Sequence, residues 1–216
     1  RHDARRPASL ASDAVRTLLI DARGRIWVGT LDQGLDVLDP KSGDVRHFRH
    51  HDGDPRSLAA DAVRALYADH SGRIWIGTDG GLSRYQDASG DFVNYGAAPN
   101  GAAQNSGPSS GVELSDSRVR AIREDHAGAL WIGTYRGGLN RLDPGTGRII
   151  AFRHDAKDTR SLSSDRVLAV LEDNEQRLWV ATSDGLDLFA PDSGTFVRYG
   201  RDADNPQSLR DSDIMS

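Results

Sequence analysis

The amino-acid sequence predicts an all-β protein assembled from four copies of one small unit. Three observations support this prediction. Four tryptophans stand in four versions of one short segment: Arg25–Thr30, Arg73–Thr78, Ala129–Thr134 and Arg177–Thr182. These segments recur about every 50 residues, a period typical of arrays of identical supersecondary units. The hydrophobic periodicity of an α-helix never persists for three turns.

Within each copy the sequence predicts four short strands separated by turns. In the second copy they are Val63–Ala68, Arg73–Thr78, Leu82–Tyr85 and Phe92–Tyr95. β-branched and aromatic residues are enriched in these segments, as in strands generally. The intervening segments, such as Asp69–Gly72 and Asp87–Gly90, are rich in the Asp, Ser and Gly that turns require. Four short antiparallel strands in about 50 residues make one blade of a β-propeller.

The predicted organisation is a single propeller segment over 1–216, with repeats at about 10–57, 58–113, 114–161 and 162–208. Residues 1–9 read as the tail of a preceding blade, and 209–216 as the start of a following one. The two ends therefore share nearly the same phase of the repeat, and we expect an open arc cut from a larger ring. Residues 97–112 read as an inserted flexible loop, either a tolerated surface insertion or a functional lid.

Composition excludes several classes of function. The 216 residues carry a net charge of −5, and 27 Lys and Arg are interspersed with 32 Asp and Glu. This balance gives no electrostatic reason to bind nucleic acid or an anionic membrane surface. The absence of cysteine excludes disulfides, thiol catalysis and zinc–thiolate sites. No apolar stretch approaches about 18 residues, so we expect no membrane contact by this segment.

Residues that recur in every unit are interpreted as structural. Large aromatic side chains bury the most area, so the recurring indoles are expected to pack between neighbouring sheets. They are Trp27, Trp75, Trp131 and Trp179. Histidine also recurs, one per unit, which spreads these side chains apart; we therefore predict no metal site and no cofactor. No catalytic residue can be singled out, because Asp occurs in nearly every turn and no nucleophile or phosphate-binding motif is present.

Candidate binding residues are those that differ between units at an equivalent place. After each repeated Thr, the glycines recur but their neighbours vary. The variable candidates are Asp32, Gln33, Asp79, Tyr135, Arg136 and Asp184. Carboxylates, an amide, a guanidinium and a phenol ring suit a carbohydrate or another small polar ligand, through hydrogen bonds and stacking. The alternative is that these residues are ordinary solvated loop tips.

The third unit, Ile122–Asp143, resembles the two-component regulator propeller repeat. The resemblance rests on Leu130–Thr134 and on the Gly137-Gly138-Leu139 turn, and it extends over four copies. The first and fourth units depart from it by a single turn glycine, and Ala181 replaces the Gly after Trp. The resemblance implies a seven-bladed propeller on the extracytoplasmic, periplasmic side of a bacterial membrane signalling protein. In some members of the family the ligands are sugar fragments.

We therefore expect a non-catalytic sensor segment that passes binding to a downstream histidine kinase or diguanylate cyclase. Its partners would be the rest of its own propeller, the downstream signalling domains and, in the full-length protein, a second copy in a homodimer. Two alternatives remain open. One is a lactonase- or lyase-type propeller enzyme with a metal at the channel mouth, for which Asp32, Asp79 and Asp184 are the acids on offer. The other is a scaffold that docks another protein.

Overall fold

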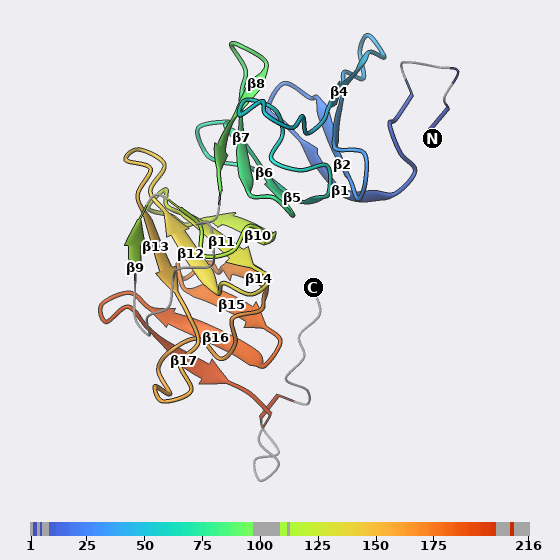
Figure 1. The fold of residues 1–216 in the computed structure, drawn as a ribbon. Coiled ribbons are helices and arrows are strands. Elements are labelled where there is room, and N and C mark those ends of the chain that lie inside the picture. Colours follow the sequence, from blue (N-terminus) through green and yellow to red (C-terminus); the bar gives the residue numbers. More distant parts are fainter. Residues whose placement is uncertain are drawn as a thin grey trace. The chain divides into compact units, whose positions relative to one another are not determined.

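The computed structural model describes residues 2, 3, 5, 9–96, 109–111, 113–201, 208 and 209, and within them every regular element is a β-strand. The chain divides into two compact units (Figure 1). The first contains Arg1–Gly96 with Ser117–Val119, and the second contains Ala97–Asp116 and Arg120–Ser216. No helix long and apolar enough to cross a membrane is found in the described residues.

The first unit holds two four-stranded antiparallel sheets, in which strands pair in chain order. The first sheet consists of β1 (Val15–Ile20), β2 (Ile26–Thr30), β3 (Leu35–Leu38) and β4 (Val45–Phe48). The second consists of β5 (Val63–Ala68), β6 (Ile74–Thr78), β7 (Leu82–Gln86) and β8 (Asp91–Tyr95). The bounds of the second sheet match the strands predicted for the second copy to within a residue, and both sheets confirm the propeller-blade architecture.

The second unit repeats the pattern. Its first sheet consists of β10 (Val119–Glu124), β11 (Leu130–Thr134), β12 (Leu139–Leu142) and β13 (Ile149–Phe152), with β9 (Ser109–Gly111) added beside β13. Its second sheet consists of β14 (Val167–Glu172), β15 (Leu178–Thr182), β16 (Gly185–Ala190) and β17 (Thr195–Tyr199). The pairing of β14 with β15 shifts register between Val167 and Ala169, as the pairing of β1 with β2 does between Val15 and Thr17.

Strand β9 corrects the prediction that the whole inserted segment is a flexible loop. Ser109 pairs with Ala151 and Gly111 pairs with Ile149, so the third blade has five strands. The outermost strand of a blade leaves a row of backbone N–H and C=O groups unpaired, and these groups can bind a passing chain of almost any composition. Composition alone therefore could not reveal this strand. Residues 97–108 and 112 lie outside the described residues.

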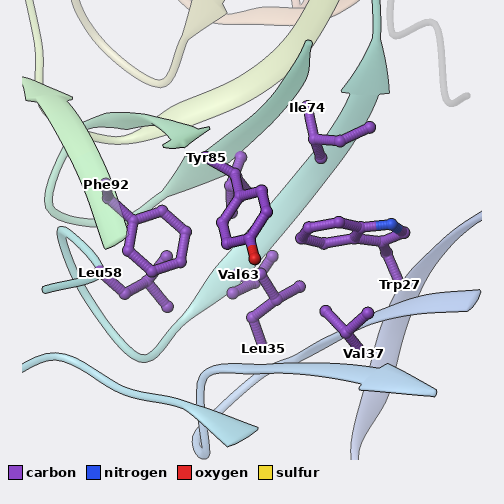
Figure 2. Packing of buried hydrophobic residues seen from close by; sticks show 9 residues of the cluster. Trp27, Leu35, Val37, Leu58, Val63, Ile74, Tyr85 and Phe92 are labelled. Carbon is purple, nitrogen blue, oxygen red and sulfur yellow. The ribbon is translucent and has the colours of Figure 1, made fainter. Parts of the chain in front are cut away.

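The core of the first unit forms where its two sheets face each other. The Trp27 ring from β2 meets the Tyr85 ring from β7 edge to face, with centroids 4.9 Å apart. Figure 2 shows the Tyr85 ring between Trp27 and Phe92, with Leu35 and Val63 close by. Trp27 and Val63, which come from different sheets, are completely buried. The apolar core of this unit therefore lies in the seam between the two blades.

The second unit has the same kind of seam. The Trp131 ring lies 4.8 Å from that of Phe189 and 5.7 Å from that of Phe152. Each indole nitrogen in the chain also donates to an Asp six residues earlier, at 2.7 to 2.8 Å; the four pairs are Trp27–Asp21, Trp75–Asp69, Trp131–Asp125 and Trp179–Asp173. The repeated indole thus combines a buried apolar body with a satisfied polar edge.

The first and last blades each leave an apolar face uncovered. On β1, Leu18 is 64% exposed and Ile20 is 68% exposed, whereas their counterparts Leu66 and Ala68 on β5 pack against the first unit's core. On β14, Leu171 is 55% exposed and borders an apolar cavity of about 390 Å³ lined also by the Trp179 ring. Both faces are of the kind that packs against a neighbouring blade, as in a partial propeller.

A buried polar residue on the third strand of each blade fastens the linker that leads into that blade. Each of these four residues is completely buried, and each accepts a hydrogen bond from a linker backbone N–H at 2.7 to 3.1 Å; they are Asp36, Ser83, Asn140 and Asp187. A buried polar group is stable only when it is hydrogen-bonded. The residue type at this position differs between blades, and so does the number of hydrogen bonds that its side chain makes.

Candidate ligand-binding face

The loops between the second and third strands of each blade are held rigidly by the repeated Thr. The hydroxyl of Thr30 donates to the Gly34 carbonyl oxygen at 2.9 Å and accepts from the Gln33 backbone N–H at 2.9 Å. Corresponding hydroxyl bonds recur at Thr78, Thr134 and Thr182, and all four side chains are fully buried. The variable loop residues therefore project from a preorganised backbone.

These loops lie beside the start of the first strand of the same blade. The backbone N–H of Leu31 donates to the Ala14 carbonyl oxygen at 3.0 Å, and that of Asp79 donates to Ala62 at 3.1 Å. The fourth blade repeats the bond between Ser183 and Arg166 at 3.1 Å. Loop tip and first strand therefore share one end of each sheet, and side chains from both can line a single face.

In the first unit, two of the three predicted residues are already engaged by arginine. Asp79 receives two hydrogen bonds from the Arg64 guanidinium, at 3.1 and 2.5 Å, and this contact raises the pKa of Arg64. The Gln33 amide oxygen accepts a hydrogen bond from Arg49. Asp32 lies exposed on the same loop as Gln33. Fork-shaped pairing of this kind fixes the carboxylate of Asp79 in one orientation.

In the second unit, Tyr135 lies among three guanidinium groups. The carbon centres of Arg120, Arg166 and Arg136 are 5.0, 5.1 and 5.5 Å from the centre of the phenol ring. Each distance is within the range of a cation–π contact. Asp184 is exposed on the corresponding loop of the fourth blade. The structure groups Tyr135 with Arg136, its neighbour on the loop, and with two arginines from first strands or their approaches.

Sequence reasoning missed Arg64, Arg120 and Arg166. A signal was available for the first two, because they occupy the same position of the first strand as Arg16, and the fourth blade has Leu168 there. A position that holds Arg in three of four copies reads as part of the repeat, so the sequence does not distinguish it from a structural position. Its role differs between blades, since Arg64 pairs with an acid and Arg120 stacks on a ring.

The recurring histidines hold linkers in place. Nδ1 of His2, His50 and His154 lies 2.7 to 2.8 Å from the carbonyl oxygen of the linker leucine eight residues later. The hydrogen bond to the Leu58 carbonyl, with a smaller contribution from Asp52, raises the pKa of His50. Within the described ranges, no three His, Asp or Glu side chains are arranged so that they could hold a metal ion.

Comparison with solved structures places this architecture among β-propellers. The extracellular domain assigned to the hybrid two-component system BT3049 of B. thetaiotaomicron matches 99% of this chain and 32% of its own, with TM-score 0.73 and 19% identity. The corresponding domain of BT4673 from the same organism matches 86% of this chain and 25% of its own, with TM-score 0.69 and 26% identity. Virginiamycin B lyase from Staphylococcus aureus matches 90% of this chain and 58% of its own, with TM-score 0.65 and 13% identity.

The chain therefore spans a quarter to a third of the length of these two extracellular domains. At 13% identity, the similarity to the lyase shows a shared fold alone. The search of curated proteins found no matching relative.

Fold and loop face together define a segment of a β-propeller with one repeated blade. The sequence model described as "Two component regulator propeller" matches four times, at residues 9–32, 57–80, 113–136 and 161–184. Each match runs from a linker through the Trp strand to the following loop. The chain therefore carries four copies of the two component regulator propeller repeat.

Proposed function

We propose that this chain is part of the extracytoplasmic sensor of a bacterial membrane-bound signalling protein. The observation that supports the proposal is the fourfold match to the two component regulator propeller, together with the extracellular domains of two-component systems among similar structures. In this proposal the segment is not catalytic. It binds a ligand or a partner, and a rigid-body movement passes the signal to a downstream kinase or diguanylate cyclase.

The ligand in this proposal is a carbohydrate bound at the loop face, with an acidic group near Tyr135. Three guanidinium groups surround that ring at 5.0 to 5.5 Å, and guanidinium is the side chain best suited to bind a carboxylate or sulfate. The phenol adds a surface on which a sugar ring can stack. In the first unit the corresponding loop position holds the carboxylate of Asp79, which would repel an acidic ligand, so the acid-binding end is assigned to the second unit.

Calorimetric titration of the whole chain with glucuronate oligosaccharides tests this assignment, with neutral glucose oligosaccharides of equal length as the reference. We expect the acidic ligand to bind more tightly and to raise the melting temperature by mass action. Tyr135→Ala should weaken binding by about tenfold, the loss of roughly one ring contact. Leu31→Ala, at the same loop position of the first blade, is the matched control and should leave the affinity unchanged. Equal binding of both ligands, or equal effects of both variants, would contradict the assignment.

The enzyme alternative requires converging metal ligands from different blades. Asp32, Asp79 and Asp184 were the acids available for it, and Asp79 is paired with Arg64. We therefore favour the sensor. Titration with Mn²⁺ or Ca²⁺ tests this choice, because saturable binding at one ion per chain would favour the enzyme.

We further propose that additional blades of the same propeller cover the two exposed apolar faces. Leu18 and Ile20 on one face, and Leu171 and Tyr199 on the other, hold positions that pack between sheets inside a unit. A longer polypeptide that includes further repeats should therefore unfold at a higher temperature than this chain. An unchanged melting temperature would argue instead that these faces dock a different protein.

A further inference from the structure

The seam between the third and fourth blades contains a cavity that the matching seam of the first unit fills with arginine. The cavity has a volume of about 770 Å³, within the usual range for small-molecule sites. Aromatic rings of Trp131, Phe152 and Phe189 line it, and Asp125 stands at its edge. It lies at the turn between the first and second strands, at the opposite end of the blade from the loop face.

In the first unit, an arginine closes this seam. Arg25 donates from Nε to Asp21 at 2.6 Å and from Nη1 to Asp87 of the next blade at 3.0 Å. Its guanidinium also lies 5.2 Å from the centre of the Trp27 ring. A second arginine, Arg46, donates to the Tyr85 hydroxyl at 3.2 Å. The seam is therefore filled by cations that bind acceptors on both blades.

In the second unit, four of these five polar groups are replaced, and only the carboxylate at the place of Asp21 is kept, as Asp125. Ala129 stands in place of Arg25, Ile150 in place of Arg46, Phe189 in place of Tyr85 and Pro191 in place of Asp87. Each replacement removes a charge or a hydroxyl from the seam. Together they leave an apolar floor where the first unit has an ion-pair network.

The replacement at Ala129 leaves the Asp125 carboxylate short of one partner. In the other three blades, Oδ2 of the equivalent Asp accepts one hydrogen bond from the indole and a second one from an arginine Nε. The second bond is 2.6 to 2.7 Å long. In the third blade, among the described residues, the side-chain donor to that oxygen is the Trp131 indole alone, at 2.7 Å. A carboxylate at the edge of an apolar cavity is a strong acceptor for a cation.

The two arginines that line the cavity, Arg141 and Arg177, do not take the missing place, since Arg177 donates to Asp173 at 2.7 Å and pairs with Glu175 at 3.0 Å. The Arg141 guanidinium lies 5.8 Å from the centre of the Trp131 ring. In the second blade, Arg84 holds the same position, 5.8 Å from the Trp75 ring, and Arg73, the counterpart of Ala129, holds a second position at 5.9 Å. The two positions are therefore distinct, and in the third blade one of them is open. The rim of the cavity is held in place by His126, whose Nδ1 lies 2.6 Å from Glu172 of the next blade.

We propose that this cavity binds a small organic cation that carries a guanidinium or amine on an apolar chain or ring. The cation would donate to Asp125 and lie against the Trp131 ring, as the protein's own arginines do in the other blades. The apolar part would contact Phe152 and Phe189. Binding of a cation over an aromatic face beside a carboxylate is favourable because both contacts are strengthened away from water.

The test is calorimetric titration of the chain with n-butylguanidinium, with the neutral n-butylurea as the isosteric reference. We expect saturable binding of one butylguanidinium per chain, and binding of butylurea weaker by about tenfold or more, as for loss of a charge-assisted bond. Ala129→Arg supplies the guanidinium within the chain, so it should abolish binding and raise the melting temperature without ligand.

The matched control is Ala127→Ser, which places on the neighbouring turn position the residue found at Ser71 in the second blade. It should bind butylguanidinium as the unaltered chain does. The higher melting temperature expected of Ala129→Arg shows that this variant is folded. Equal binding of the urea, undiminished binding by Ala129→Arg, or no saturable binding would each overturn the proposal.

Discussion

Replacing Asp187 with Asn should stabilise the protein, although it removes a charge from a buried hydrogen-bonded residue. Asp187 is completely buried, and one carboxylate oxygen accepts from the Ser163 N–H at 2.9 Å and from its hydroxyl at 2.8 Å. The other oxygen has no hydrogen-bond partner in the described residues. The third blade shows the remedy, because Asn140 accepts from the Ser115 N–H and donates its amide to the Ser115 hydroxyl at 2.8 Å.

The magnitude follows from the unpaired oxygen. A buried polar atom without a partner destabilises a protein by about 1–3 kcal/mol, and an ionised one by more. The amide loses one charge-assisted bond from the Ser163 hydroxyl, which offsets part of the gain. We therefore expect Asp187→Asn to stabilise by about 1 kcal/mol at pH 7, which for a chain of this size raises the melting temperature by roughly 2–4 °C.

The gain should depend on pH with a defined sign. Burial raises the pKa of Asp187, and the bonds from Ser163 only partly oppose it. The folded state therefore binds more protons than the unfolded state between the ordinary pKa of 3.8 and the raised value. The stability of the unaltered chain falls as pH rises through that window. The stabilisation by Asp187→Asn should therefore be greatest at pH values above the raised pKa, and it should disappear as the pH falls towards 3.8.

Thermal unfolding monitored by tryptophan fluorescence, at pH 7 and at a pH near 4, measures both effects. Asp36→Asn is the matched control, because Asp36 is equally buried but both its oxygens are bonded, to the Ala11 N–H and to His47 Nδ1, each at 2.7 Å. This control should destabilise by about 1–2 kcal/mol. The reasoning is refuted if Asp187→Asn lowers the melting temperature as Asp36→Asn does, or if its gain is the same at both pH values.

Two further predictions concern the repeat itself. Trp27→Phe removes the indole bond to Asp21 at 2.8 Å from a fully buried site, so it should destabilise by about 2–3 kcal/mol in urea unfolding; a loss below 1 kcal/mol would mean that the bond is dispensable. Gly34→Ala should destabilise far more than Gly24→Ala, although both glycines have φ near +80°. A Cβ at Gly34 would lie 2.2 Å from the Phe48 carbonyl oxygen, whereas Gly24 faces open space, so we expect about 3 kcal/mol or more against about 1 kcal/mol; equal melting temperatures would contradict the steric argument.

Much of the fold could be predicted because its signals are local. Strand residues such as Val63–Ala68 alternate with Asp- and Gly-rich turns, and both patterns act over a few residues. The fourfold repetition then gives each blade the same strand order without any knowledge of long-range contacts. The candidate loop residues could be selected for a related reason, since variation at an otherwise repeated place shows that the blade's shape does not require them.

The remaining features depend on which side chains meet across a seam, and these the tertiary structure alone decided. Strand β9 exists because a blade edge offers unpaired backbone groups, which no composition records. Tyr135 meets Arg166 only because one blade's loop lies beside the start of the next blade. Ala129 stood visibly in the sequence where the other copies have arginine, but its consequence needed the partner positions Phe189 and Pro191 to be brought opposite it. Local preference determines what each blade is, whereas packing between blades determines where a cavity or an unpaired charge is left.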